Sequence, residues 1–117
     1  MTAAPTWQHT GARFTVKVGA VGYTRDNRSG CGSGTWQRWA LVPTLPDGRP
    51  ALHWRDGKAR HVGPRVSGKA APAWLHRAMA YCQRVGPMSL HELDAVATWF
   101  RANPRGEPDL VALVVPF

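Results

Sequence analysis

The sequence predicts an α+β domain in which a mostly antiparallel β-sheet is covered on one face by a two-helix hairpin. Apolar and polar residues alternate in the first half of the chain, and apolar residues recur at three- and four-residue spacing between 71 and 103. An apolar run at 110–115 then predicts a returning C-terminal strand at 109–115. Strands grouped before helices are typical of the α+β class. With 117 residues and 44% hydrophobic content, the chain is the size of a single domain.

The β-rich part is predicted to occupy residues 12–66, after a loose leader at 1–11. Phe14, Val16 and Val18 alternate with polar residues, which is the period of a strand with one buried and one solvated face. The first half of the chain therefore begins with a half-buried strand.

A second strand is predicted at 35–42, where aromatic and β-branched residues are frequent. A polar, glycine-rich loop at 24–34 connects it to the first strand. Gly63-Pro64 and the segment 67–72 are predicted to end the sheet and to lead into the helices.

The Asp56-Gly57 dipeptide predicts a two-residue hairpin turn, because these residue types tolerate the positive φ of a type I′ turn. Such a turn fixes the pairing, which would be Arg55 with Lys58, Trp54 with Ala59, and His53 with Arg60. One face of the hairpin would then be basic, and the opposite face, with Leu52, Trp54, Ala59 and His61, would face the core.

The helical hairpin at 71–103 has a stop signal between its two helices. Gly86 stands where a helix C′ residue is expected. Ser89 and Glu92 have the spacing of a capping box that begins the second helix, which should end near Asn103. A helix-turn-helix motif is not predicted, because the outer face of the second helix carries acidic residues where a DNA-reading helix would be basic.

The charge of the chain is strongly positive and unevenly distributed. Fifteen Lys+Arg residues stand against seven Asp+Glu residues, which gives a formal net charge of +8. The positive charge is concentrated in the β-rich part, whereas the last quarter of the chain has more acidic than basic residues. An arginine-rich coding bias explains the excess of arginine over lysine, but it does not explain the shortage of acids. The composition therefore points to an anionic partner.

The predicted binding surface is the solvated face of the sheet. If Trp39 and Leu41 face the core beside Trp54, basic side chains gather on the opposite face. Phosphates would neutralise this face, and the release of their condensed counterions would drive binding. The predicted nucleic-acid-binding residues are Arg13, Lys17, Arg38, His53, Arg55, Lys58 and Arg60 on the sheet, Arg65 and Lys69 (with Arg25 and Arg28) on flexible segments, and Trp36 as a stacking aromatic. The competing interpretation is an ordinary solvated face in an arginine-rich protein.

Catalytic and metal-binding patterns do not emerge from the sequence. The histidines are scattered without the spacing of a helical metal site, and the acids show no pairing that would set up acid and base roles. The loop at 28–34 lacks the phosphate-loop pattern and leads into a strand. Cys31 and Cys82 are interpreted as reduced thiols. No catalytic residue, metal or cofactor is predicted.

The sequence thus predicts a small, non-enzymatic nucleic-acid-binding protein that contacts the phosphates of DNA or RNA through a basic sheet face. The alternative is a protein-interaction module or inhibitor, for example a phage- or plasmid-encoded factor acting against a host defence complex. Such a factor would dock on an acidic protein or a ribonucleoprotein. With no apolar stretch of signal-peptide or membrane-spanning length, the chain is expected to be cytoplasmic and not membrane-bound.

Overall fold

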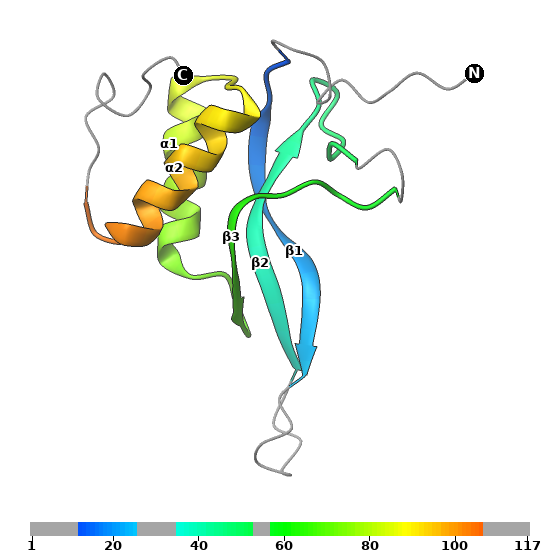
Figure 1. Cartoon of the computed structure of the whole chain (residues 1–117), viewed down its shortest axis with the longest axis vertical. Helices are drawn as coiled ribbons and strands as arrows, with labels where there is room; N and C mark the ends of the chain where they lie inside the picture. The colour runs from blue at the N-terminus through cyan, green and yellow to red at the C-terminus, as the bar shows by residue number, and fades with distance from the viewer. Residues whose placement is uncertain (1–11, 26–34, 53–56, 107–117) are drawn as a thin grey trace.

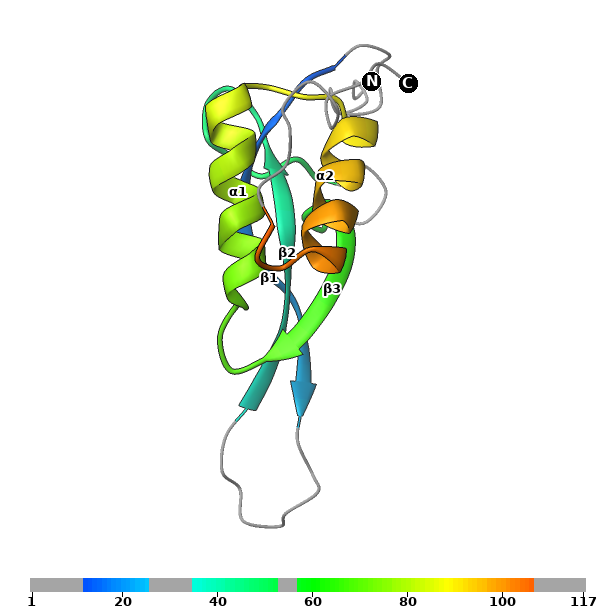
Figure 2. The same cartoon turned by 90° about the vertical axis from the view of Figure 1, so that its left-hand side faces the viewer.

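A computed structural model describes residues 12–25, 35–52 and 57–106, and it shows a three-stranded sheet with two helices packed on it. In chain order the elements are β1 (Thr15–Arg25), β2 (Thr35–Thr44), β3 (Val62–Gly68), α1 (Ala73–Val85) and α2 (Leu90–Ala102). The sheet is antiparallel with the order β1-β2-β3. Both helices lie on one side of the sheet, which we call the helix face, and we call the opposite side the outer face (Figure 1, Figure 2). The predicted α+β class is confirmed.

The core lies between the helix face and the two helices. Val18 pairs with Leu41 and Trp39 pairs with Val66, so these four side chains share the helix face and pack in or against the core. Complete burial of a side chain such as Leu41 stabilises the fold by about 1.5–3 kcal/mol. The buried cluster is formed by Phe14, Val16, Leu41, Ala51, Val62, Leu75, Ala78, Tyr81, Cys82, Met88, Leu93, Val96, Ala97 and Phe100.

The prediction that Gly63-Pro64 ends the sheet is wrong, because both residues lie inside β3. Gly63 has a φ of 74°, and its amide donates a hydrogen bond to the Asp94 Oδ1 at 2.8 Å. A Cβ at this position would lie 2.3 Å from the Cβ of Ala97 in α2. The glycine is thus required for the close approach of β3 to α2, and the register irregularity between Trp39 and Leu41 accommodates this bend.

The predicted two-residue turn at Asp56-Gly57 is also wrong in its register. Ala59 pairs with Leu52 and not with Trp54, and the Arg60 amide donates to the Ala51 carbonyl at 2.7 Å. The buried residue of this segment is Ala51, whereas Leu52 is 42% exposed. The pairing is decided by Ala51, which continues the sheet beside the end of β2, and not by the local turn preference.

The helical hairpin agrees closely with the prediction. The Ser89 Oγ accepts a hydrogen bond from the Glu92 amide, and the Glu92 Oε1 accepts one from the Ser89 amide, so the capping box is present. Gly86 ends α1 with a φ of 104°. Neither α1 nor α2 is long and apolar enough to cross a membrane, and no other helix is found in the described residues. The predicted leader (1–11) and C-terminal strand (109–115) lie outside the described residues.

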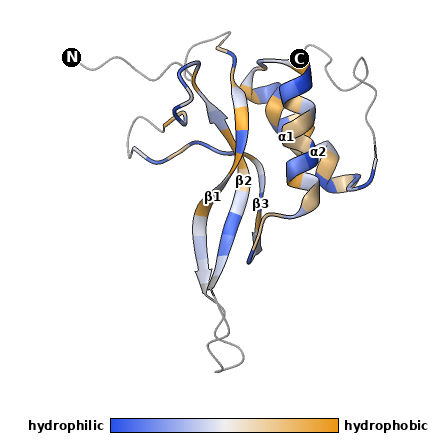
Figure 3. Cartoon of the chain, turned by 180° about the vertical axis from the view of Figure 1, so that it is seen from behind, coloured by the Kyte–Doolittle hydropathy of each residue, from blue (hydrophilic) through white to orange (hydrophobic). Residues whose placement is uncertain are grey.

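The far end of the β1–β2 hairpin extends past the helices (Figure 1, Figure 2). We call residues 22–25 and 35–38 the arm. A bulge between Ala20 and Gly22 precedes the arm and changes the strand direction locally. Figure 3 shows a hydrophilic stretch on β2 in this part of the hairpin. The arm is the part of the sheet that the helices do not cover on either face.

Candidate nucleic-acid interface

The strands contribute cations and no carboxylate. Their basic residues are Lys17 and Arg25 in β1, Arg38 in β2 and Arg65 in β3, and none of the three strands contains Asp or Glu. Lys17 lies between Val16 and Val18, which pack in or against the core, so strand alternation places the exposed Lys17 side chain on the outer face.

Arg38 is fixed against the outer face of the arm. It pairs with Gly22, and its Cδ lies 3.6 Å from the point that a Cβ of Gly22 would occupy, so the aliphatic part of Arg38 lies across β1. Its Nε donates a hydrogen bond to the Thr24 Oγ1 at 3.0 Å. Trp36 pairs with Thr24 and shares this face two residues away. A partly buried guanidinium and a partly buried indole therefore lie next to one another on the arm.

Arg65 joins the outer face from β3. Val66 pairs with Trp39 and packs against the core, whereas Ser67 pairs with Arg38. Alternation along β3 therefore directs Arg65 and Ser67 to the outer face, and Arg65 is exposed. Three of the predicted binding cations, one from each strand, are thus brought to one face.

The outer face is not uniformly solvated, which differs from the prediction. Ala40, Val42 and Thr44 of β2 are buried there, at 0%, 8% and 4% exposure. The hydroxyl oxygens of Thr15 and Thr44 are 2.6 Å apart and share a hydrogen bond. The outer face therefore includes buried side chains as well as cations.

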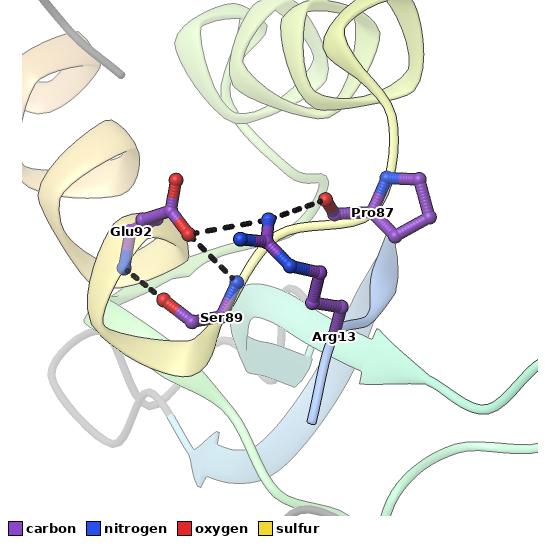
Figure 4. Close-up of polar contacts among 4 residues, drawn as sticks. All are labelled: Arg13, Pro87, Ser89 and Glu92. Carbon is purple, nitrogen blue, oxygen red and sulfur yellow. Dashed lines mark hydrogen bonds and ion pairs between the residues drawn. The ribbon is translucent and has the colours of Figure 1, made fainter. Parts of the chain in front are cut away.

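The structure does not place Arg13 on the outer face. Its Nη1 donates to the Pro87 carbonyl at 3.3 Å and lies 3.6 Å from the Glu92 Oε1, at the link between the helices (Figure 4). The guanidinium is already next to a carboxylate, since the chain before β1 crosses toward this link through the Phe14–Met88 bridge. Because the Arg13 side chain is 60% exposed, we expect this pair to contribute only about 0–1 kcal/mol.

The other predicted binding cations in the described residues, Lys58, Arg60 and Lys69, lie outside the three strands. Arg60 lines a pocket beside α2, together with His61, His91 and Asp94. Lys58 is exposed in the segment before β3, and Lys69 is exposed in the link to α1. The predicted contacts of His53 and Arg55 lie outside the described residues.

The three carboxylates in the described part of the chain all have partners elsewhere. The Asp47 Oδ2 lies 2.6 Å from the Arg49 Nε, and hydrogen bonds from the Arg49 amide and guanidinium lower the pKa of Asp47. Glu92 belongs to the capping box, and Asp94 accepts from Gly63. No described carboxylate therefore neutralises the outer face.

A metal centre and a reactive thiol find no support in the described residues. Within 12–25, 35–52 and 57–106, no three His, Cys, Asp or Glu side chains are grouped to hold a metal ion. Burial raises the pKa of the Cys82 thiol to about 12, which makes its thiolate scarce at neutral pH. Cys31 lies outside the described residues.

Two features of the surface are not part of the predicted binding site. Tyr23 is 60% exposed on the arm, where it pairs with Gln37 on the side opposite Trp36. Its position in the strand was visible in the sequence, but its exposure depends on where the helices end. The pocket at Arg60 is formed by segments about thirty residues apart, so no local sequence pattern could predict it.

Comparison of the chain with protein-family models, curated proteins and solved structures finds no match.

Proposed function

We propose that this protein binds nucleic acid through the outer face of its sheet and the arm, mainly by contacts to phosphates. The observation that supports the proposal is the gathering of Lys17, Arg38 and Arg65, each from a different strand, on a face whose strands contain no carboxylate. Lys and Arg side chains in such a set displace condensed counterions from a nucleic-acid backbone, and this supplies affinity without base specificity.

The arm refines the mode of binding. Beyond Gln37, the last arm residue that pairs with β3, the arm is a two-stranded β-ribbon, and such a ribbon fits into the major groove of B-form DNA, which is about 12 Å wide. The major groove of A-form RNA is too narrow for side chains to read, so binding by the arm favours duplex DNA. On the outer face of the arm, Arg38 donates to Thr24 and Trp36 lies nearby. Tyr23 supplies an aromatic ring on the opposite face of the arm. The phosphate contacts come from Lys17 and Arg65, and the arm contributes groove contacts.

The test is a titration of labelled duplex DNA, single-stranded DNA and duplex RNA, read by fluorescence anisotropy between about 50 and 200 mM salt. We expect duplex DNA to bind most tightly and its affinity to fall steeply with salt. Lys17→Gln and Arg65→Gln should each weaken binding and lower the salt slope by about one. Arg38→Gln should weaken DNA binding further, because this variant also loses the hydrogen bond from Arg38 to Thr24.

Arg101→Gln and Arg105→Gln are matched controls, because they remove the same charge from exposed positions in the last turn of α2 and just beyond it. These variants should change affinity much less than the outer-face variants. The proposal fails if no nucleic acid binds at low salt, or if the controls weaken binding as much as Lys17→Gln and Arg65→Gln. A binding partner retained after nuclease treatment, with no DNA affinity, would favour the protein-interaction alternative instead.

A further inference from the structure

A second candidate site lies on the opposite side of β3, between the start of that strand and the first turn of α2. It is a pocket of about 380 Å³ lined by Arg60, His61, Val62, Gly63, Leu90, His91 and Asp94. A larger pocket of about 440 Å³ lies beside α1. Its Arg77 donates to the carbonyls of Pro104 and Gly106 and lies over the Phe100 ring, so this arginine already has a structural role.

The walls of the pocket are held together by backbone and side-chain contacts. The Gly63 amide donates to the Asp94 Oδ1 at 2.8 Å, which ties β3 to α2. The absence of a side chain at Gly63 lets Ala97 approach closely on the same side. The backbone walls of the pocket are therefore fixed by the packing of β3 against α2, and the Arg60, His91 and Asp94 side chains around it are exposed.

The groups that line this pocket favour an anion. The Arg60 guanidinium carries a permanent charge, and the His61 and His91 imidazoles donate N–H groups. His91 is the second residue of α2, so it lies at the positive end of the helix dipole. Asp94 is the one carboxylate of the lining, and it already accepts the Gly63 amide. Glu92 of the same turn instead faces Ser89 and Arg13 (Figure 4).

We propose that this pocket binds a phosphate group, with the Arg60 guanidinium and the His61 and His91 imidazoles as hydrogen-bond donors. The phosphate belongs either to a nucleic-acid backbone or to a free nucleotide or phosphate ion. The inference goes beyond the proposed function, since the pocket and the outer face share none of their residues.

Binding in this pocket should be coupled to protonation of His61. Burial lowers the pKa of His61 first, and the charges of Arg65 and Arg60 lower it further, so the free imidazole is mostly neutral at pH 7. A phosphate placed against His61 favours the protonated form and opposes the effect of the two arginines. His91 and Asp94 are the other titratable groups of the lining. For the DNA duplex, whose phosphodiesters keep their charge over this range, affinity should therefore increase as the pH falls from 7.5 toward about 6.

The experiment is an NMR titration of the histidine ring protons of the full chain with inorganic phosphate, with adenosine monophosphate and with a short DNA duplex. We expect saturable shifts at His61 and His91, and an upward shift of the His61 pKa in the presence of phosphate. His76, which is exposed on α1, is the internal control and should not respond. Arg60→Gln should weaken phosphate binding about tenfold or more, as expected for the loss of a charged hydrogen-bond donor.

The Arg101→Gln variant is the charge-matched control and should leave phosphate binding unchanged. Shifts with phosphate and nucleotide but not with DNA identify a free phosphate ligand, and shifts with DNA that Arg60→Gln removes identify the backbone; both support the site. The proposal is overturned if no probe shifts His61 and His91 saturably, or if His76 shifts equally. Lys17→Gln should not change the phosphate titration, so failure here and failure of the outer-face function are separate outcomes.

Discussion

Gly63 shows how one residue connects the strand, the helix and the candidate pocket. Its positive φ, its hydrogen bond to Asp94 and its close approach to Ala97 all occur at the point where β3 crosses α2. An L-residue in the left-handed region costs about 1–2 kcal/mol, and a methyl group forced into a filled core costs about 1–3 kcal/mol more.

We therefore expect Gly63→Ala to lower the free energy of unfolding by about 2–4 kcal/mol, measured by urea denaturation. Gly48→Ala is the matched control, because Gly48 also has a positive φ but no atom lies within 4 Å of its Cβ position. That control should lose only about 1–2 kcal/mol. Removing the opposing methyl in the double variant Gly63→Ala/Ala97→Gly should recover part of the loss. Equal losses in Gly63→Ala and Gly48→Ala would show that the contact with Ala97 is unimportant.

Among the elements, α2 depends on the cap at its first turn. The reciprocal bonds between Ser89 and Glu92 satisfy two amides that the helix cannot bond internally, and Arg13 approaches the same carboxylate (Figure 4). This turn also presents His91 to the candidate phosphate pocket, so the cap positions part of that site.

We expect Ser89→Ala to lower the free energy of unfolding by about 1 kcal/mol, because the Glu92 amide loses its acceptor. Urea denaturation provides the measurement. Thr98→Ala, an exposed position in the same helix, is the control and should change stability by less than about 0.5 kcal/mol. A loss in Ser89→Ala no larger than that in Thr98→Ala would contradict a stabilising role for the cap.

For the whole molecule, the excess of positive charge lowers the free energy of unfolding, and binding of a polyanion would raise it again. The formal net charge is +8, and the described carboxylates are engaged in a turn, a cap and a strand–helix contact. Self-repulsion among the cations opposes the compact state, and dissolved salt screens it.

We expect the free energy of unfolding to increase between about 10 and 100 mM NaCl, over which the Debye length falls from about 30 to about 10 Å. The ion pairs Arg13–Glu92 and Arg49–Asp47, whose arginines are exposed, weaken over the same range, but each contributes at most about 1 kcal/mol. The charge-reversal variant Arg105→Glu should show a smaller increase with salt. A stability that falls as salt is added would indicate that attractive pairs outweigh the repulsion.

The sequence by itself determined the features that depend on neighbours within about one helical turn or along one strand. The spacing of apolar residues located both helices, Ser89 and Glu92 located the cap, and alternation placed Lys17 on the solvated side of β1. These signals are local, because hydrogen bonds within a helix and side-chain direction along a strand involve residues close in the chain.

Only the tertiary structure decided which surfaces those elements share. Ala51 set the pairing of Leu52 with Ala59, α2 bent β3 at Gly63, and the link between the helices drew Arg13 away from the outer face. The candidate phosphate pocket likewise joins His61 to His91 across two elements. Each outcome depends on packing between segments distant in the chain, where burial and hydrogen bonding outweigh local turn and strand preferences.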